Sequence, residues 1–162
     1  MRSRFALATT LSLWLTGCQN HAALQASMAV DESLLINTYW KLLTVNDDPL
    51  VVADNVREAH IVLHIDNSAR LAGATGCNTL SGGYQHTRQQ LTFHPIVTTK
   101  MTCPAALMPI EQAMLSALYQ TTHWKINGER LVLFNDKGEP LAGLRAVHLY
   151  LSGPGIRCRL SA

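Results

Sequence analysis

Four cysteines carry the most reactive side chains in this 162-residue sequence: Cys18, Cys77, Cys103 and Cys158. Cysteines can be acylated, joined in disulfides, bound to a metal ion or used in redox exchange. No two of the four have the Cys-x-x-Cys spacing that redox and zinc sites use. The spacing therefore argues against a thioredoxin-like role and favours acylation or disulfide formation.

The first cysteine stands at the end of an export signal. Arg2 and Arg4 precede an apolar stretch, residues 5–15, that is too short for a stable transmembrane helix. The stretch ends in Leu-Thr-Gly-Cys, which resembles a bacterial lipobox with Cys18 as the acylated residue. The alternative is an ordinary secretory signal peptide with a chance cysteine at its end.

Acylation of Cys18 would make this chain a bacterial lipoprotein. Its acyl chains, such as palmitate, contribute about 0.8 kcal/mol per buried methylene and hold the protein on a bilayer surface. Gln19 follows the cysteine, whereas an aspartate there would indicate retention at the inner membrane. We therefore expect an outer-membrane location that faces the periplasm.

Cleavage before Cys18 also changes the charge of the chain. The sequence has 13 basic and 11 acidic residues, and removal of Arg2 and Arg4 leaves 13 − 2 = 11 basic residues. The mature chain is then formally neutral, which argues against a nucleic-acid partner. We divide the chain into a signal peptide (residues 1–17), a lipid-anchored tether (18–34), one domain (35–151) and a C-terminal tail (152–162).

The domain has the pattern of a β-rich fold with one long helix. Alternating or β-branched runs predict strands at residues 39–45, 59–66, 70–75, 84–87, 90–94, 124–126, 131–134 and 141–151. Gly82 and Gly83 are interpreted as turn residues, and Pro95 as the end of a strand. A helix begins near Pro109, with an apolar stripe of Ile110, Met114, Leu115 and Leu118.

Several short motifs in the domain resemble the META domain of the heat-shock protein HslJ. They are Gly76-Cys77-Asn78, Gly83-Tyr84 and Thr99-Lys100-Met101-Thr102-Cys103. The resemblance implies an α+β fold: a mostly antiparallel, barrel-like β-sheet with one principal helix packed on it. It also implies a bacterial envelope protein connected with stress and drug tolerance, and it does not imply an enzyme.

The same motifs imply a disulfide between Cys77 and Cys103, because export places them in an oxidising compartment. The alternative is two reduced cysteines buried as small apolar residues. Cys158 is then left over, as a free thiol, an intermolecular partner or a competitor for one of the other two. The sequence leaves these three fates open.

Other residues that could do chemistry lack the required spacing. His60 and His64 lie four residues apart on a predicted strand, which is about 13 Å and too far for one ion. Ser81 and Ser152 precede glycines without the Gly-x-Ser-x-Gly pattern of a nucleophile elbow. We therefore expect no metal site, no cofactor and no catalytic residue.

Three functions remain in view. The leading one is a non-enzymatic, lipid-anchored envelope protein that acts in envelope maintenance or stress tolerance through an envelope protein partner. The second is a small periplasmic inhibitor of a hydrolase such as lysozyme, with an exposed loop at residues 78–81 or 135–138 that plugs a cleft. The third is an enzyme whose site the motifs do not reveal.

Overall fold

A computed structural model describes residues 34–51, 56–66 and 68–147. Within these ranges nine strands form one antiparallel sheet, and one helix packs on it. The elements are β1 (Tyr39–Val45), β2 (Asp48–Pro49), β3 (Ala59–Ile65), β4 (Ala69–Thr75), β5 (Thr79–Thr87), β6 (Gln90–Thr98), η1 (Ala105–Leu107), α2 (Met108–Gln120), β7 (His123–Asn127), β8 (Arg130–Phe134) and β9 (Pro140–Val147). The expected α+β, mostly antiparallel fold is confirmed.

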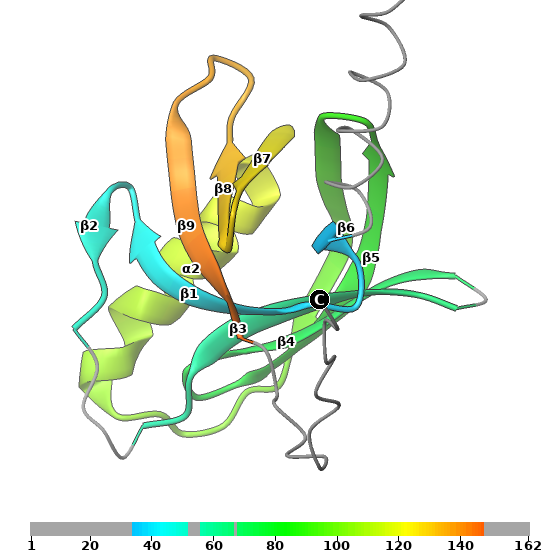
Figure 1. Ribbon diagram of the computed structural model, residues 1–162. Helices are drawn as coiled ribbons and strands as arrows, with labels where there is room; N and C mark the ends of the chain where they lie inside the picture. The colour runs from blue at the N-terminus through cyan, green and yellow to red at the C-terminus, as the bar shows by residue number, and fades with distance from the viewer. Residues whose placement is uncertain (1–33, 52–55, 67, 148–162) are drawn as a thin grey trace, which may run out of the picture.

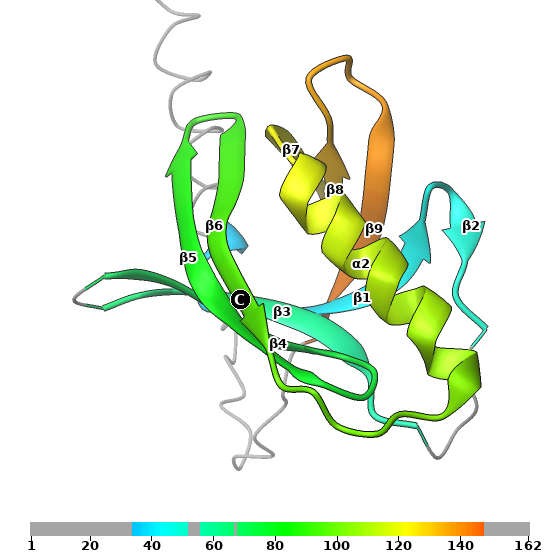
Figure 2. The ribbon, with the colours of Figure 1, turned by 180° about the vertical axis from the view of Figure 1, so that it is seen from behind.

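The sheet closes into a ring because β1 pairs with β9 on one side and with β3 on the other (Figure 1). Every neighbouring pair is antiparallel, but the pairing of β6 with β7 is limited to Gln90 opposite His123. Beyond that point α2 lies between β6 and the β7–β9 strands (Figure 2). The Tyr119 hydroxyl of α2 donates to the Ile96 carbonyl oxygen at 3.2 Å, so the helix is joined to β6.

The interior of the ring is filled by alternate strand residues. Among the largest buried side chains are Trp40, Phe93, Leu35, Ile61, Leu63, Leu71, Leu80, Leu91, Met114, Leu131, Leu133 and Leu144. Trp40 is 1% exposed, and its indole nitrogen donates to the Leu35 carbonyl oxygen at 3.0 Å. Trp40 is therefore a core residue whose polar atom is satisfied inside the protein.

The strands β5 and β6 are longer than the predicted strands at residues 84–87 and 90–94. Gly82 and Gly83 lie inside β5, and β6 continues through Pro95 to Thr98. A Cβ atom added at Gly82 would lie 2.2 Å from the Pro95 carbonyl oxygen. These glycines therefore allow two strands to approach closely at an irregular register, which the turn interpretation missed.

The alternation along β3 buries Ile61 and Leu63, but Ile65 is 55% exposed because it lies at the far end of the strand. In α2 Met114, Ala117 and Leu118 are buried and Leu115 is partly buried against the same core, so the helix packs through the predicted apolar stripe with Ala117 added. No helix in the described part of the chain is long and apolar enough to cross a membrane.

Some predictions concern residues that the described ranges do not include. The signal peptide, Cys18 and nearly all of the tether precede residue 34. The last residues of the predicted final strand and Cys158 follow Val147. These predictions remain as stated.

Candidate functional site

The motif cysteines meet at the corner between β4 and β5. Cys77 and Cys103 form a disulfide, with their Cα atoms 6.0 Å apart. This separation lies in the usual range for the bond, which joins the corner to the segment before η1. Gly76 adopts a φ of +96°, a conformation that side-chain-bearing residues rarely adopt. The disulfide that the motifs imply is therefore present, and Gly76 provides the backbone conformation of the corner.

Asn78 connects the corner to two other segments, residues 99–103 and the first turn of α2. Its side-chain nitrogen donates to Glu111 Oε2 at 2.8 Å and lies 3.4 Å from Cys103 Sγ. Its side-chain oxygen accepts from the Met101 backbone nitrogen at 2.9 Å and from Thr99 Oγ1 at 3.0 Å. Asn78 is only 5% exposed, so these bonds satisfy an amide that water cannot reach.

Thr75 and Glu111 complete this network, and the sequence analysis did not single out either for it. The buried Thr75 hydroxyl donates to Glu111 Oε2 at 2.9 Å. Glu111 belongs to the first turn of α2, so its carboxylate joins the helix to the β4–β5 corner. The only local signals were a polar residue directly before Gly76 and an acidic residue after Pro109.

The corner residues contact one another, and these contacts hold the β4–β5 corner, the segment before η1 and the start of α2 together. Glu111 accepts from two neutral donors, and the Asn78 amide has partners on both of its polar atoms. The Thr75 hydroxyl that donates to Glu111 is fully buried, so this contact lies inside the fold. Within residues 34–51, 56–66 and 68–147, no group of three or more His, Cys, Asp or Glu side chains could hold a metal ion.

The Gly83-Tyr84 motif lies away from the corner, within β5. The Tyr84 side chain is buried, and its hydroxyl donates to the His64 carbonyl oxygen at 3.2 Å. Burial raises the pKa of this phenol above its ordinary value, and the Asp66 carboxylate raises it further. Tyr84 thus stabilises the β3–β5 region as a neutral hydrogen-bond donor.

A surface groove lies where β6 and β7 have their short pairing, and we call it the seam groove. It consists of three adjoining hollows of about 300, 310 and 490 Å³ that share His123. Its lining residues are Gln85, His86, Thr87, Arg88, Gln89, Gln90, Leu91, Thr92, Thr122, His123, Trp124, Lys125, Ile126 and Phe134. The groove is therefore built from the β5–β6 turn, the start of β7 and the end of β8.

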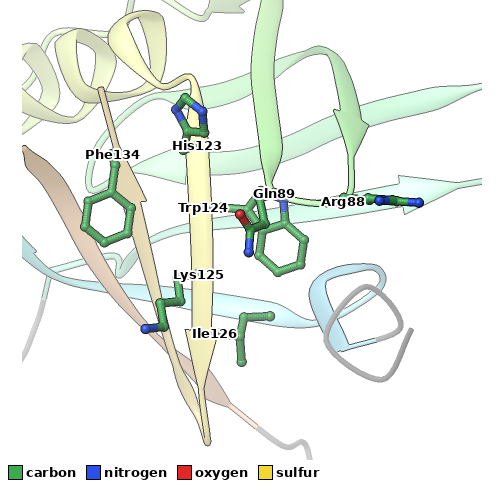
Figure 3. A pocket seen from close by; sticks show the side chains of 7 residues that line it. All are labelled: Arg88, Gln89, His123, Trp124, Lys125, Ile126 and Phe134. Carbon is green, nitrogen blue, oxygen red and sulfur yellow. The ribbon is translucent and has the colours of Figure 1, made fainter. Parts of the chain in front are cut away.

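Figure 3 shows how one hollow of the seam groove is lined. Trp124 and Ile126 project to one side of β7, whereas Lys125 projects to the other. The Gln89 amide lies against the indole of Trp124, and the Arg88 side chain extends away from β7. The buried indole nitrogen of Trp124 has no hydrogen-bond partner. No sequence motif marks a site here, because these residues follow no known pattern.

The comparison with protein families identifies the domain. The sequence matches the META domain over residues 33–148. The chain belongs to the META domain family. This match covers the whole described sheet and helix, and it includes the corner and the seam groove.

Solved structures share the fold of this META domain. One is an NMR structure with a TM-score of 0.55 and 19% identity, which covers 70% of this chain and 92% of that chain. Another is an NMR structure of a protein from Burkholderia xenovorans, with a TM-score of 0.58 and 22% identity over 88% of this chain and 99% of that chain. A comparison with curated proteins found no match.

The structure sorts the predicted site residues of the META domain into two places. Cys77, Cys103, Asn78, Thr99 and Met101 converge at the corner with Gly76. Gly83 and Tyr84 lie in β5. The motifs by which we named the family therefore carry the fold, and the seam groove uses different residues.

Proposed function

We propose that this META domain protein is a non-enzymatic, lipid-anchored protein of the bacterial envelope, similar to HslJ, that contributes to envelope maintenance or to stress and drug tolerance. The disulfide between Cys77 and Cys103 is the observation that carries the proposal. Such bonds persist in oxidising compartments and are rare in the cytosol. Export by the N-terminal signal would bring the chain to such a compartment.

The lipobox-like end of the signal supports an anchor at Cys18, and Gln19 supports the periplasmic face of the outer membrane. The role proposed for the folded domain is contact with another envelope component. The use of the motif residues as mutual hydrogen-bond partners supports a binding role over catalysis, because those side chains are already committed to the fold.

Intact-mass analysis of the native protein under non-reducing conditions tests the anchor and the disulfide together. We expect a chain that begins at Cys18 and carries acyl groups. Its mass should also be lower than that of the fully reduced chain by the two hydrogen atoms lost when one disulfide forms. The variant Cys18→Ser should remain unacylated and leave the membrane fraction, whereas the matched variant Cys158→Ser should stay acylated. An unmodified Cys18 in the native protein would overturn the anchor.

The physiological role is tested in cells that lack the protein. Growth under envelope stress, such as a detergent or an antibiotic that the envelope normally excludes, should be reduced. The wild-type chain should restore growth and Cys18→Ser should not, although both carry the same folded domain. Equal growth of the deleted and parent strains in every such condition would overturn the role.

Inhibition of a hydrolase is the second candidate, and one exposed turn favours it. Asn135 Oδ1 accepts from the backbone nitrogens of Lys137 and Glu139 at 3.0 and 2.9 Å, which holds Asp136 and Lys137 out in solvent. The other predicted loop, residues 78–81, is wrong for this purpose because Asn78 and Leu80 are buried. Inhibition of lysozyme by the wild-type chain, lost in Asp136→Ala, would support this candidate. Full lysozyme activity at saturating protein would remove it.

A further inference from the structure

The seam groove carries positive charge without compensating acids. Arg88 and Lys125 are the two cationic residues of its lining, and His86 and His123 line the same hollows. No aspartate or glutamate lines any of its three hollows. A cleft lined by charges of one sign concentrates ligands of the opposite sign. The groove therefore favours an anion.

Trp124 adds a donor that lacks an acceptor. Its side chain is 5% exposed, and its indole nitrogen is buried without a hydrogen-bond partner. An indole N–H can only donate, so the missing partner must be an acceptor atom. The exposed Gln89 side chain lies beside the indole (Figure 3), and both residues line the same hollow. By contrast, the Trp40 indole nitrogen already has its partner inside the protein.

Arg88 occupies a backbone position that does not suit it. The β5–β6 turn gives Arg88 a φ of +39°, where glycine or asparagine would be less costly. The same conformation is taken by glycine in the β7–β8 turn, at Gly128 with a φ of +61°. An arginine in this conformation indicates that its side chain is useful there. Arg88 lines the seam groove, so we assign the use of its side chain to that groove.

The neutral part of the lining indicates the rest of the ligand. Amide side chains (Gln85, Gln89 and Gln90) and hydroxyl side chains (Thr87, Thr92 and Thr122) line the hollows. Each of these groups can both donate and accept, as the hydroxyls of a sugar do. The aliphatic lining residues Leu91 and Ile126 are buried beneath them. The amide and hydroxyl side chains reach solvent above them, and such groups match the hydroxyls of a carbohydrate.

We propose that the seam groove binds a carboxylate-bearing carbohydrate. Arg88 and Lys125, which extend to different sides of β7, pair with separate carboxylates along the chain of sugars. The amide and hydroxyl side chains bind its hydroxyls, and the Trp124 indole N–H donates to one of its oxygens. This site does not depend on the lipid anchor, so its binding is tested separately from the attachment at Cys18.

NMR of the full chain in detergent micelles observes the proposed hydrogen bond directly. The probe is a tetramer of galacturonic acid, and the signals are the ¹H–¹⁵N resonances of the indole groups. We expect the Trp124 resonance to move downfield on titration and the Trp40 resonance to stay, because Trp40 already donates to Leu35. Trp124→Phe assigns the signal. A Trp124 resonance that does not move at saturation overturns the proposal.

Calorimetry with variants tests the cationic part of the groove. Arg88→Gly should weaken binding of the tetramer at least about tenfold, since it removes a charge-assisted hydrogen bond. Glycine suits the positive φ, so this variant should remain folded with an unchanged or higher midpoint of unfolding. Lys100→Gly removes an exposed cation near the opposite end of β6 and should bind within about twofold of wild type. Equal affinity of Arg88→Gly and Lys100→Gly overturns the proposal.

Two further probes decide the ligand class. The neutral galactose tetramer should bind at least about tenfold more weakly than the acidic one, because it lacks the carboxylates. Tetraglutamate, which carries carboxylates on a peptide, should also bind more weakly. Binding of tetraglutamate equal to or tighter than that of the acidic sugar overturns the carbohydrate assignment and indicates an acidic peptide.

Discussion

The Asn78 side-chain nitrogen lies 2.8 Å from a carboxylate oxygen of Glu111, which is 33 residues away in sequence. This contact joins the β4–β5 corner to the first turn of α2. The same carboxylate oxygen accepts from the buried Thr75 hydroxyl at 2.9 Å. The helix is therefore fixed on the ring by polar contacts at its beginning and by apolar packing along its length.

Replacement of Asn78 by alanine should destabilise the domain by about 3 kcal/mol, because it leaves the Met101 nitrogen and the Glu111 carboxylate short of partners. Urea denaturation measures the change in the free energy of unfolding. Thr102→Ala, an exposed change in the same segment, should alter it by less than about 0.5 kcal/mol. Equal stabilities of the two variants would show that the network is not important for the fold.

Reduction of the disulfide between Cys77 and Cys103 should lower the free energy of unfolding by about 3.5 kcal/mol, from the entropy of a loop that spans 26 residues. The comparison is urea denaturation with and without a reductant. The double variant Cys77→Ser/Cys103→Ser should be destabilised to a similar extent and should not respond to reductant. A reductant effect of the same size in the double variant would assign the stabilisation to another bond.

Replacement of Gly82 by alanine should cost about 3 kcal/mol, because the new Cβ atom would lie 2.2 Å from the Pro95 carbonyl oxygen and the strands must separate. Thermal and urea denaturation measure the loss. The neighbouring change Ser81→Ala, at an exposed position of β5, should be nearly neutral. A wild-type midpoint for Gly82→Ala would contradict the close approach of β5 and β6.

Stability should fall as the pH rises into the alkaline range. Burial raises the pKa of both Tyr39 and Tyr84, and the carboxylates of Glu58 and Asp66 respectively raise it further. A phenol whose pKa is raised on folding keeps its proton when the unfolded chain has lost it. Its stabilisation is therefore complete below the unfolded pKa of about 10 and is lost as the pH rises through the folded pKa.

The free energy of unfolding at pH 8, 10 and 11 measures this dependence. The double variant Tyr39→Phe/Tyr84→Phe should lose less stability over the interval than the wild type, because it lacks both phenols. The single change Tyr84→Phe should account for part of the difference, since burial and the Asp66 carboxylate raise the pKa of the Tyr84 phenol. Parallel curves for wild type and double variant would exclude these two tyrosines as the cause.

Local patterns predicted most of the elements because strand alternation and turn chemistry are short-range. The run at residues 39–45 coincides with β1, and the runs at 124–126 and 131–134 lie within β7 and β8. The β5–β6 pairing was predicted poorly. Glycines that serve a turn and glycines that serve a close strand approach look alike in sequence, and the Pro95 oxygen beside Gly82 is a non-local contact.

By itself, the sequence determined the β-rich domain with a single long helix and the motifs that mark its family, because these follow from neighbours along the chain. It also supplied the cysteines and the lipobox-like signal on which the proposed envelope location rests. Only the tertiary structure decided that Asn78 meets Glu111 and that Arg88 and Trp124 line one groove. Those pairs are 33 and 36 residues apart, and closure of the ring brings them together.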